Sequence, residues 1–283
     1  MKRVWYHSSC FDGYGAAWAA SKSLGRGDGV VYKACSHKTK AEIPEFNPGD
    51  KIYIVDFSFP RPDLLGIKDQ LGPDGSLLVL DHHVTAQEEL EGLDFCVFDM
   101  KRSGAGMAWD HFMNTITRPV MINLIEDRDL WQFRFQATQP FHSYMRSQPF
   151  DFEVWDQVAH TMDTDPQSIV LQGESILRFT ETEVKRICNK ATVTEILGHP
   201  AAVVNATGFW SEVGHLLLDE YPQAAFAASF GFLPTGEVLW SLRGRKDGLA
   251  VSEIAKHFGG GGHAQASGMR TKSLEEVFTK WKT

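Results

Sequence analysis

Residues 77–83 read LLVLDHH, a short apolar run that ends in Asp81, His82 and His83. A continuous apolar run of about four to eight residues is typical of a strand buried on both faces, as in a parallel sheet. Polar side chains that follow such a strand lie at its carboxyl end, where open α/β sheets bind their ligands. The run therefore predicts a buried strand and a candidate site directly after it.

Strand-like and helix-like patterns alternate on either side of this run. Runs rich in β-branched and aromatic residues predict strands, and stretches with helical spacing separate them. The predicted strands are 4–6, 30–32, 51–55, 77–80 and 95–98, and the predicted helices are 13–24, 63–71 and 104–113. This alternation favours an α/β fold with a doubly wound, mainly parallel sheet.

The second half of the chain has a different pattern. Residues 119–190 are mainly helical, and strand-like runs return at 201–204, 225–230 and 237–243. The length of 283 residues exceeds the roughly 100–200 residues of one domain. We therefore predict a first domain over 1–188 that ends in a helical connector, a linker over 189–199, and a smaller α/β domain over 200–283.

The charge balance limits the class of partner. The chain holds 28 basic and 36 acidic residues, a net charge of −8. This balance argues against a broad basic track for long nucleic acid. Residues 199–283 are neutral, with eight residues of each sign, so the acidic excess lies in 1–198. Those carboxylates either form a solvated surface or hold metal ions.

The cysteine pattern and the hydropathy bear on the compartment. Four cysteines lie far apart without a C-x-x-C pair, which fits neither a disulfide framework nor a zinc ribbon. No apolar run approaches the roughly 18 residues of a membrane span. We therefore expect a cytoplasmic protein with no membrane partner. A homodimer stays open, because the sequence does not address the oligomeric state.

Two further predicted strands end in side chains that bind metals. His7 and Asp12 follow the strand at 4–6, and Asp56 follows the strand at 51–55. With the DHH run they supply imidazole and carboxylate groups, which suit a first-row divalent ion such as manganese. A single aspartate after a strand is more often a turn former or a helix cap. The prediction of a metal site therefore rests on their convergence.

A fourth contribution comes from the segment IEDRD at 125–129. Asp127 and Asp129 lie two residues apart in it, and either could complete the metal site. We prefer Asp127 because it comes earliest after the apolar helix. A surface salt-bridge cluster explains the segment equally well.

Four consecutive glycines at 259–262 precede His263. Glycine permits positive φ and close backbone approach, so the N–H groups of Gly260, Gly261 and Gly262 can form a concave anion site. The alternative is a helix stop, for which one glycine would be enough. The run therefore favours a phosphate-binding loop that ends at His263.

Two more residues are candidates for binding substrate phosphate. Arg243 follows the strand-like residues 239–242 and carries a planar guanidinium that can bind phosphate in a bidentate manner. The alternative is an ordinary solvated charge. Ser103 opens the predicted helix at 104–113 and can cap either a phosphate or that helix.

These motifs resemble the DHH phosphoesterase family. The DHH run follows an apolar strand, with His7, Asp12 and Asp56 upstream of it. The segment EIAKHFGGGGHAQASG at 253–268 is similar to the glycine-rich signature of the DHH-associated C-terminal domain found in RecJ-like exonucleases and nanoRNases. The two signatures stand in the family's order and cover nearly the whole chain.

The resemblance implies a centre of two divalent metal ions, of which Mn²⁺ is the leading candidate. It implies that His7 and Asp56 hold the first ion. The second ion would be held by Asp56 as a bridging carboxylate, together with Asp12, His82 and either Asp127 or Asp129. Within the DHH run, Asp81 would orient a ligand histidine and His83 would meet the scissile phosphate.

One position departs from the family pattern. The family's first motif carries two acidic residues, but the segment HSSCFDG at 7–13 has one, and Cys10 stands where the other is expected. The thiol is either a metal ligand, which would favour softer ions, or a small buried apolar side chain. Both alternatives stay open.

The implied reaction is hydrolysis of a phosphoester by water activated between two divalent ions. The absence of a G-x-S-x-G elbow and of a P-loop lysine weakens the serine-hydrolase and nucleotide-triphosphatase alternatives. The neutral second domain favours short linear oligonucleotides, such as 5′-phosphorylated diribonucleotides, cut to mononucleotides. Alternative substrates are cyclic dinucleotides, 3′-phosphoadenosine 5′-phosphate and a single strand degraded processively. A nucleotide-binding sensor with an impaired metal site is the non-enzyme alternative.

Overall fold

The computed structural model describes residues 1–36, 42–114 and 117–278. The chain divides into two compact units, Met1–Leu177 and Arg178–Thr283. Each unit has its own sheet and its own apolar core. None of the described helices is both long enough and apolar enough to span a membrane.

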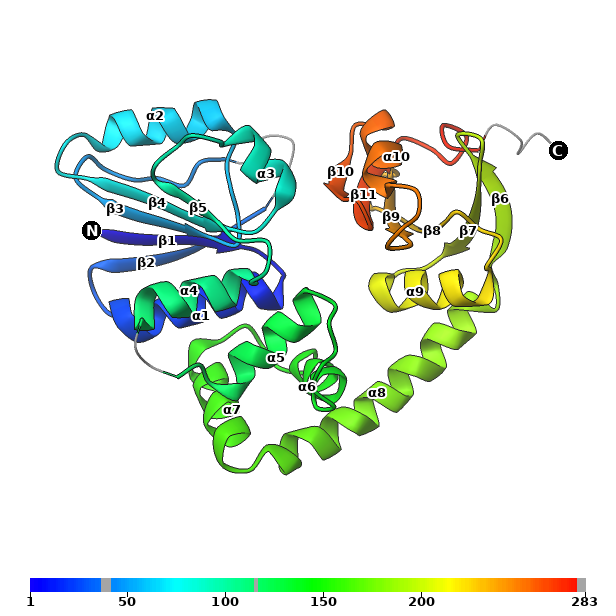
Figure 1. Cartoon of the computed structure of the whole chain (residues 1–283), viewed down its shortest axis with the longest axis horizontal. Helices are drawn as coiled ribbons and strands as arrows, with labels where there is room; N and C mark the ends of the chain where they lie inside the picture. Colours follow the sequence, from blue (N-terminus) through cyan, green and yellow to red (C-terminus); the bar gives the residue numbers. More distant parts are fainter. Residues whose placement is uncertain (37–41, 115–116, 279–283) are drawn as a thin grey trace. The chain divides into compact units, whose positions relative to one another are not determined.

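The first unit is built on a five-stranded sheet in the order β2-β1-β3-β4-β5 (Figure 1). All of its strand pairs are parallel, which confirms the predicted doubly wound sheet. The strands are β1 (Lys2–His7), β2 (Val30–Cys35), β3 (Lys51–Val55), β4 (Ser76–Asp81) and β5 (Cys96–Phe98). The chain moves outward from β1 in both directions, so a topological switch point lies between β1 and β3. Ligands of such sheets bind at the carboxyl ends of the strands at this point.

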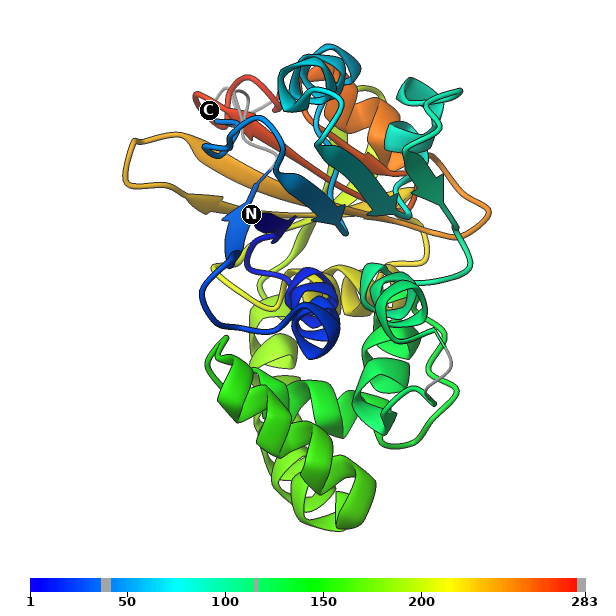
Figure 2. The same ribbon diagram turned by 90° about the vertical axis from the view of Figure 1, so that its left-hand side faces the viewer.

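Helices cover both faces of this sheet. Figure 1 shows α2 (Arg61–Leu71) and α3 (Val84–Glu89) on one face and α1 (Phe11–Leu24) and α4 (Gly104–Met113) on the other. α1 and α4 pack side by side, as the turned view in Figure 2 also shows. Because both faces are covered, the run at 77–80 in β4 is apolar throughout, and neighbours such as Val79 and Leu80 belong to different apolar clusters.

A run of helices completes the first unit. α5 (Val120–Asp129) packs against α1 and α4, and it is followed by α6 (Thr138–Met145) and α7 (Phe152–Thr164). α8 (Pro166–Cys188) begins in the first unit and ends in the second. These helices confirm the predicted helical connector.

The structure differs from the prediction at the linker over 189–199. The two units divide within α8, and β6 (Thr192–Ile196) occupies part of the predicted linker. β6 forms an antiparallel hairpin with β7 (His199–Asn205) through Leu197 and Gly198, both with positive φ. β6 lies at the edge of the second sheet, and Ile196 is its one buried residue, so its sequence TVTEI lacks the apolar run of a buried strand.

The second unit is a smaller α/β structure, as predicted. Its six-stranded sheet has the order β10-β11-β9-β8-β7-β6, in which the β7–β8 pair is parallel and the other pairs are antiparallel. Its further elements are α9 (Trp210–Glu220), β8 (Phe226–Phe232), β9 (Val238–Gly244), α10 (Val251–His257), β10 (Gly261–His263) and β11 (Ala266–Thr271). Separate apolar clusters join α9 and α10 to the sheet.

Candidate metal centre

The candidate site lies at the carboxyl edge of the first sheet, at the switch point. β1 ends at His7, Asp56 follows β3 directly, and β4 ends at Asp81, with His82 and His83 next in the chain. Asp56 has a positive φ of 55°, so the chain turns sharply as it leaves β3. These strand ends bring His7, Asp56 and His82 together, as the sequence predicts.

His82 stands among three carboxylates. Its Nε2 atom lies 3.2 Å from Oδ1 of Asp56 and 3.6 Å from Oδ2 of both Asp12 and Asp129. Asp12 and Asp56 are buried, whereas the Asp129 side chain is 27% exposed. Imidazole and carboxylate groups at this spacing form a donor set for a first-row divalent ion.

The charged groups in this cluster shift one another's pKa values. Burial and the neighbouring carboxylates raise the pKa of Asp12 well above its usual range. Burial also raises the pKa of Asp56, but His7 and His82 outweigh it and hold that pKa well below its usual range. Burial lowers the pKa of His82, but Asp56 and Asp129 outweigh it and raise the pKa to about 10. The cluster therefore stabilises positive charge at its centre.

One carboxylate oxygen in the cluster is left without a hydrogen bond. Oδ1 of Asp56 is buried and accepts no hydrogen bond within the part of the chain that the structure describes. It lies 3.2 Å from Nε2 of His82, but a buried oxygen that accepts no hydrogen bond is costly, and a cation would offset that cost. Three groups have donor atoms within 4.8 Å of one another: His7, Cys10 and Asp56; Asp56, His82 and His83; and Asp12, His82 and Asp129. The residues present therefore fit bound metal.

Asp12 is held in place by the start of α4. Its two carboxylate oxygens accept hydrogen bonds from the backbone N–H groups of Gly104 at 2.6 Å and Ala105 at 2.9 Å. A side chain at position 104 would overlap the Asp56 side chain, so only glycine fits there. Sequence reasoning missed this role of Gly104. The available signal was a glycine at the first turn of a helix that follows a strand of the same sheet.

The structure brings Asp129 to the centre and leaves Asp127 out of it. The Asp127 side chain is fully buried and accepts hydrogen bonds from the backbone N–H groups of Arg134 and Phe135 and from Thr138 Oγ1 at 2.6 Å. The Arg134 side chain also donates to it, at 3.1 Å. These donors occupy both oxygens of Asp127, whose role is to fix the loop that leads into α6. The structure therefore favours Asp129 over Asp127 as the candidate ligand, contrary to the prediction.

Asp81 lies behind the centre and orients His83. It is fully buried, and its Oδ1 atom lies 2.6 Å from Nδ1 of His83. The Ser58 hydroxyl donates to its other oxygen, and the backbone N–H of His82 donates to Oδ1 at 2.7 Å. Burial raises the pKa of Asp81, but the bonds from His83 and Ser58 outweigh it, so the net shift is downward. Asp81 thus orients the ring of His83, the residue predicted to meet the phosphate, and its predicted role of orienting a ligand histidine stays a prediction.

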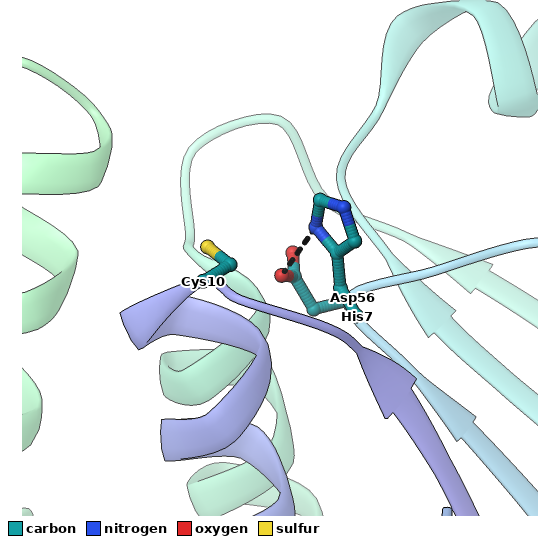
Figure 3. Close-up of side chains that lie close together, drawn as sticks. All are labelled: His7, Cys10 and Asp56. Carbon is teal, nitrogen blue, oxygen red and sulfur yellow. Dashed lines mark ion pairs between the residues drawn. The ribbon is translucent and has the colours of Figure 1, made fainter. Parts of the chain in front are cut away.

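Cys10 lies at the N-terminal end of α1, and Figure 3 shows it beside the Asp56 carboxylate, with His7 on the other side of that carboxylate. It occupies the N-cap position, but its side chain makes no capping hydrogen bond. Burial raises the pKa of the thiol well above its usual range, and Asp56 and Asp12 raise it further. The structure thus places the thiol at the position that the family pattern gives to a carboxylate.

Ser103 is a helix cap. Its hydroxyl oxygen accepts a hydrogen bond from the backbone N–H of Gly106 at 3.2 Å, and its own N–H donates to Glu126. The next two N–H groups of α4 bind Asp12, as described above. Of the two alternatives raised for Ser103, the structure therefore shows the cap. A contact with phosphate stays a prediction.

The four glycines of the second unit are used within the fold. The N–H groups of Gly259 and Gly260 donate to carbonyls in the last turn of α10, which ends the helix. Gly261 and Gly262 belong to β10 with His263, in a hairpin with β11. A side chain at Gly260 or Gly262 would overlap the backbone of β11. Close packing thus explains these two glycines, and anion binding by Gly260, Gly261, Gly262 and His263 stays a prediction.

Arg243 is anchored on β9. Its guanidinium donates to Ser241 Oγ at 3.0 Å, to the Leu242 carbonyl at 2.8 Å and to Ser211 Oγ at 2.8 Å. These bonds fix the direction of the side chain, as a binding residue requires. Its contact with substrate stays a prediction.

The fold and the donor set together define a two-unit α/β protein whose clustered histidines and carboxylates could bind metal. No family model matches the sequence. The chain is 31% identical over 290 residues to an uncharacterised protein of Acanthamoeba polyphaga mimivirus, with 96% of this chain and 68% of that protein covered. It is 24% identical over 303 residues to oligoribonuclease NrnB of Bacillus subtilis, with 96% and 74% covered. The chain belongs to the DHH phosphoesterase family.

Solved structures share the fold at low sequence identity. An exopolyphosphatase-related protein of Bacteroides fragilis has a TM-score of 0.56 at 14% identity, with 97% of this chain and 88% of that chain covered. A pGpG-specific phosphodiesterase of Vibrio cholerae has a TM-score of 0.52 at 16% identity, with 97% and 94% covered. RecJ of Thermus thermophilus, solved with Mn²⁺, has a TM-score of 0.52 at 14% identity, with 95% and 49% covered.

Proposed function

We propose that this protein is a metal-dependent phosphodiesterase that cuts short linear oligonucleotides, such as 5′-phosphorylated diribonucleotides, to mononucleotides. The observation that carries the proposal is the carboxylate of Asp56, buried at the switch point with an oxygen, Oδ1, that accepts no hydrogen bond from a described residue and lies 3.2 Å from Nε2 of His82. Around it stand the imidazoles of His7 and His82 and further carboxylates, so the donors of a metal-activated hydrolase converge on one point.

The proposal assigns two divalent ions, most simply Mn²⁺, to this cluster. His7 and Asp56 would hold one ion, and Asp12, Asp56, His82 and Asp129 would hold the other. When bound, such ions lower the pKa of a shared water and offset the charge that develops on the phosphoryl oxygens. The ends of β1, β3 and β4 carry His7, Asp56 and His82, and α1 and α5 carry Asp12 and Asp129. Regular elements of the fold therefore position the donors.

His83 acts on the substrate side of the proposed centre, and the buried Asp81 orients it from behind. Asp81 accepts a hydrogen bond from Nδ1 of His83. Burial lowers the pKa of His83, but Asp81 outweighs it and raises the pKa, and in the protonated ring Nε2 can donate a hydrogen bond to the scissile phosphate. Ser58 and the chain around Asp81 fix that carboxylate in turn. In the second unit, Arg243 is our candidate ligand for another substrate phosphate, because Ser211 and Ser241 hold its guanidinium in a set direction.

The size of the substrate follows from charge and from the relatives. Residues 199–283 carry no net charge, which argues against a track for long nucleic acid. Relatives named as an oligoribonuclease and as a pGpG-specific phosphodiesterase support a substrate of one or a few nucleotide linkages. Cyclic dinucleotides, 3′-phosphoadenosine 5′-phosphate, a single strand degraded processively, and binding without turnover are the competing outcomes.

Chromatographic analysis of products tests the proposal directly. The protein is incubated with Mn²⁺ and, separately, a 5′-phosphorylated diribonucleotide, a cyclic dinucleotide, 3′-phosphoadenosine 5′-phosphate and a long single-stranded RNA. We expect mononucleotides from the diribonucleotide and much slower turnover of the others. Binding without products under every divalent ion would favour the nucleotide sensor instead.

A pair of matched variants separates the metal centre from a contaminating nuclease. Asp56→Asn removes the bridging charge and is expected to abolish turnover. Asp69→Asn makes the same chemical change on the exposed surface of α2 and is expected to leave turnover unchanged. Equal activity of the two variants would contradict the proposed centre.

A further inference from the structure

The four cysteines of the chain differ in their surroundings. Cys35 and Cys188 belong to apolar clusters, and Cys96 packs against one. Cys10 belongs to none of the apolar clusters formed by the described residues, and ionisable side chains that include His7 and Asp56 lie around it. A small apolar side chain gains its stability from apolar contacts. The surroundings of Cys10 are therefore unsuited to a mere space-filling role.

The position of Cys10 in the chain points the same way. The N-cap of a helix favours Ser, Thr, Asp or Asn, whose side chains accept a hydrogen bond from the first turn. Cys10 occupies this position in α1 and makes no such bond. Its sulfur instead lies in a group with His7 and Asp56 whose donor atoms are all within 4.8 Å of one another (Figure 3). The thiol thus faces potential ligands rather than its own helix.

A second, independent observation indicates a ligand at this group. Asp56 is 1% exposed, and its Oδ1 atom accepts no hydrogen bond from any described residue. Its Oδ2 atom lies 3.6 Å from Nδ1 of His7, a spacing longer than a normal hydrogen bond. A nitrogen, a sulfur and an oxygen therefore converge on one point, as donors do around a shared ion.

We propose that Cys10 binds the first metal ion through Sγ, together with His7 and Asp56, and so gives that site a preference for a thiophilic ion such as Zn²⁺ or Co²⁺ over Mn²⁺. The inference rests on the proposed function for the assignment of His7 and Asp56. Ligation breaks the S–H bond, forms a sulfur–metal bond and releases the proton to the buffer. Thiolate ligands select softer ions, whereas carboxylates suit harder ones, so one side chain changes the metal preference.

Absorption of the cobalt-loaded full-length chain tests this ligand. A thiolate bound to Co²⁺ gives a near-ultraviolet charge-transfer band that imidazole and carboxylate ligands do not give. We expect the band in the wild type and in Cys96→Ser, a matched change at a cysteine outside the site. We expect its loss in both Cys10→Ser and Cys10→Asp. Absence of the band from wild-type protein with Co²⁺ bound, or its survival in Cys10→Asp, overturns the proposal.

If Cys10→Ser fails to fold, Cys10→Asp still allows the sulfur ligand to be tested. It restores the carboxylate of the family pattern, so metal counting should still find bound ions. The ratio of Zn²⁺ to Mn²⁺ affinity is expected to fall about tenfold or more relative to the wild type. An unchanged ratio counts against a sulfur ligand.

The absorption measurement needs no turnover, so it separates this inference from the proposed function. A charge-transfer band in a protein that hydrolyses no oligonucleotide would support the Cys10 ligand and contradict the activity. Hydrolysis of the diribonucleotide by a protein whose bound Co²⁺ gives no band would support the activity and contradict the ligand.

Discussion

Two aspartates on α5 are expected to respond in opposite ways to the same substitution. Asp127→Asn should destabilise the first unit and leave the metal centre intact, because the buried Asp127 side chain binds the loop before α6. Asp129→Asn should abolish activity and leave stability unchanged, because its side chain is partly exposed and faces His82. The two positions lie two residues apart on one helix, so each variant is the other's control.

The size of the stability effect follows from the bonds that Asp127 accepts. The Arg134 side chain is 58% exposed and can bond to water instead, so its loss costs little. Thr138 is buried, and its unsatisfied hydroxyl would cost about 1–3 kcal/mol. The two backbone N–H groups add about 0.5–1.5 kcal/mol each. Asp127→Ala, which removes every acceptor, should therefore cost about 3 kcal/mol, and Asp127→Asn about half of that because one oxygen remains.

Thermal unfolding and metal-dependent hydrolysis measure the two effects separately. A loss of 3 kcal/mol should lower the melting temperature of a unit of this size by about 6–12 °C. Asp129→Asn should change the free energy of unfolding by no more than about 0.5 kcal/mol. It should lower activity about 100-fold or more, since even indirect contacts to a metal are worth about 10- to 100-fold. A fully stable but inactive Asp127→Asn, beside an active Asp129→Asn, would refute this reasoning.

Three further outcomes are expected. Gly104→Ala inserts a methyl group against Asp56 and should lower activity about 100-fold. The control Gly66→Ala places its methyl group in open space on α2, and urea unfolding should find it neutral or stabilising by up to about 1 kcal/mol. Burial raises the pKa of Asp156, but Arg26 outweighs it and lowers the pKa to about 2. Because this folded-state pKa lies below the unfolded value of about 4, the Asp156 carboxylate stabilises the fold above about pH 4, and this contribution is lost as the pH falls toward 2. Over this range the melting temperature of Asp156→Asn should therefore fall less steeply than that of the wild type. Mn²⁺ at about 100 times its dissociation constant should stabilise the protein by about 2.7 kcal/mol, and a chelator should reverse the shift in melting temperature.

The sequence predicts most of the first sheet because its strands are covered on both faces. The run at 77–80 lies within β4 (Ser76–Asp81), and the run at 51–55 matches β3. Once strands of a parallel sheet are located, their carboxyl ends must meet at one edge, so His7, Asp56 and His82 could be grouped without a structure. The edge strand β6 could not be found in this way, since one covered face leaves no continuous apolar run.

The choice between Asp127 and Asp129 lay beyond the sequence for a geometric reason. Residues two apart on a helix point about 200° away from each other, so only one of the pair can face the sheet edge. Which one does depends on how α5 packs against α1 and α4, and those contacts join distant parts of the chain. The role of Gly104 also depends on contacts between distant parts of the chain. Glycine is required there because Asp56, which follows β3, approaches the start of α4 closely.

The arrangement around His82 is itself an argument for a bound cation. Asp12 and Asp56 are buried within reach of one imidazole, and Asp129 faces the same atom. Like charges gathered in a buried site repel one another and lose hydration, so such a cluster costs stability in the absence of a compensating charge. Natural sequences keep conflicts of this kind mainly where function uses them. The protonated His82 offsets part of the repulsion, and divalent ions would offset more, so activity and stability should both rise as the ions bind.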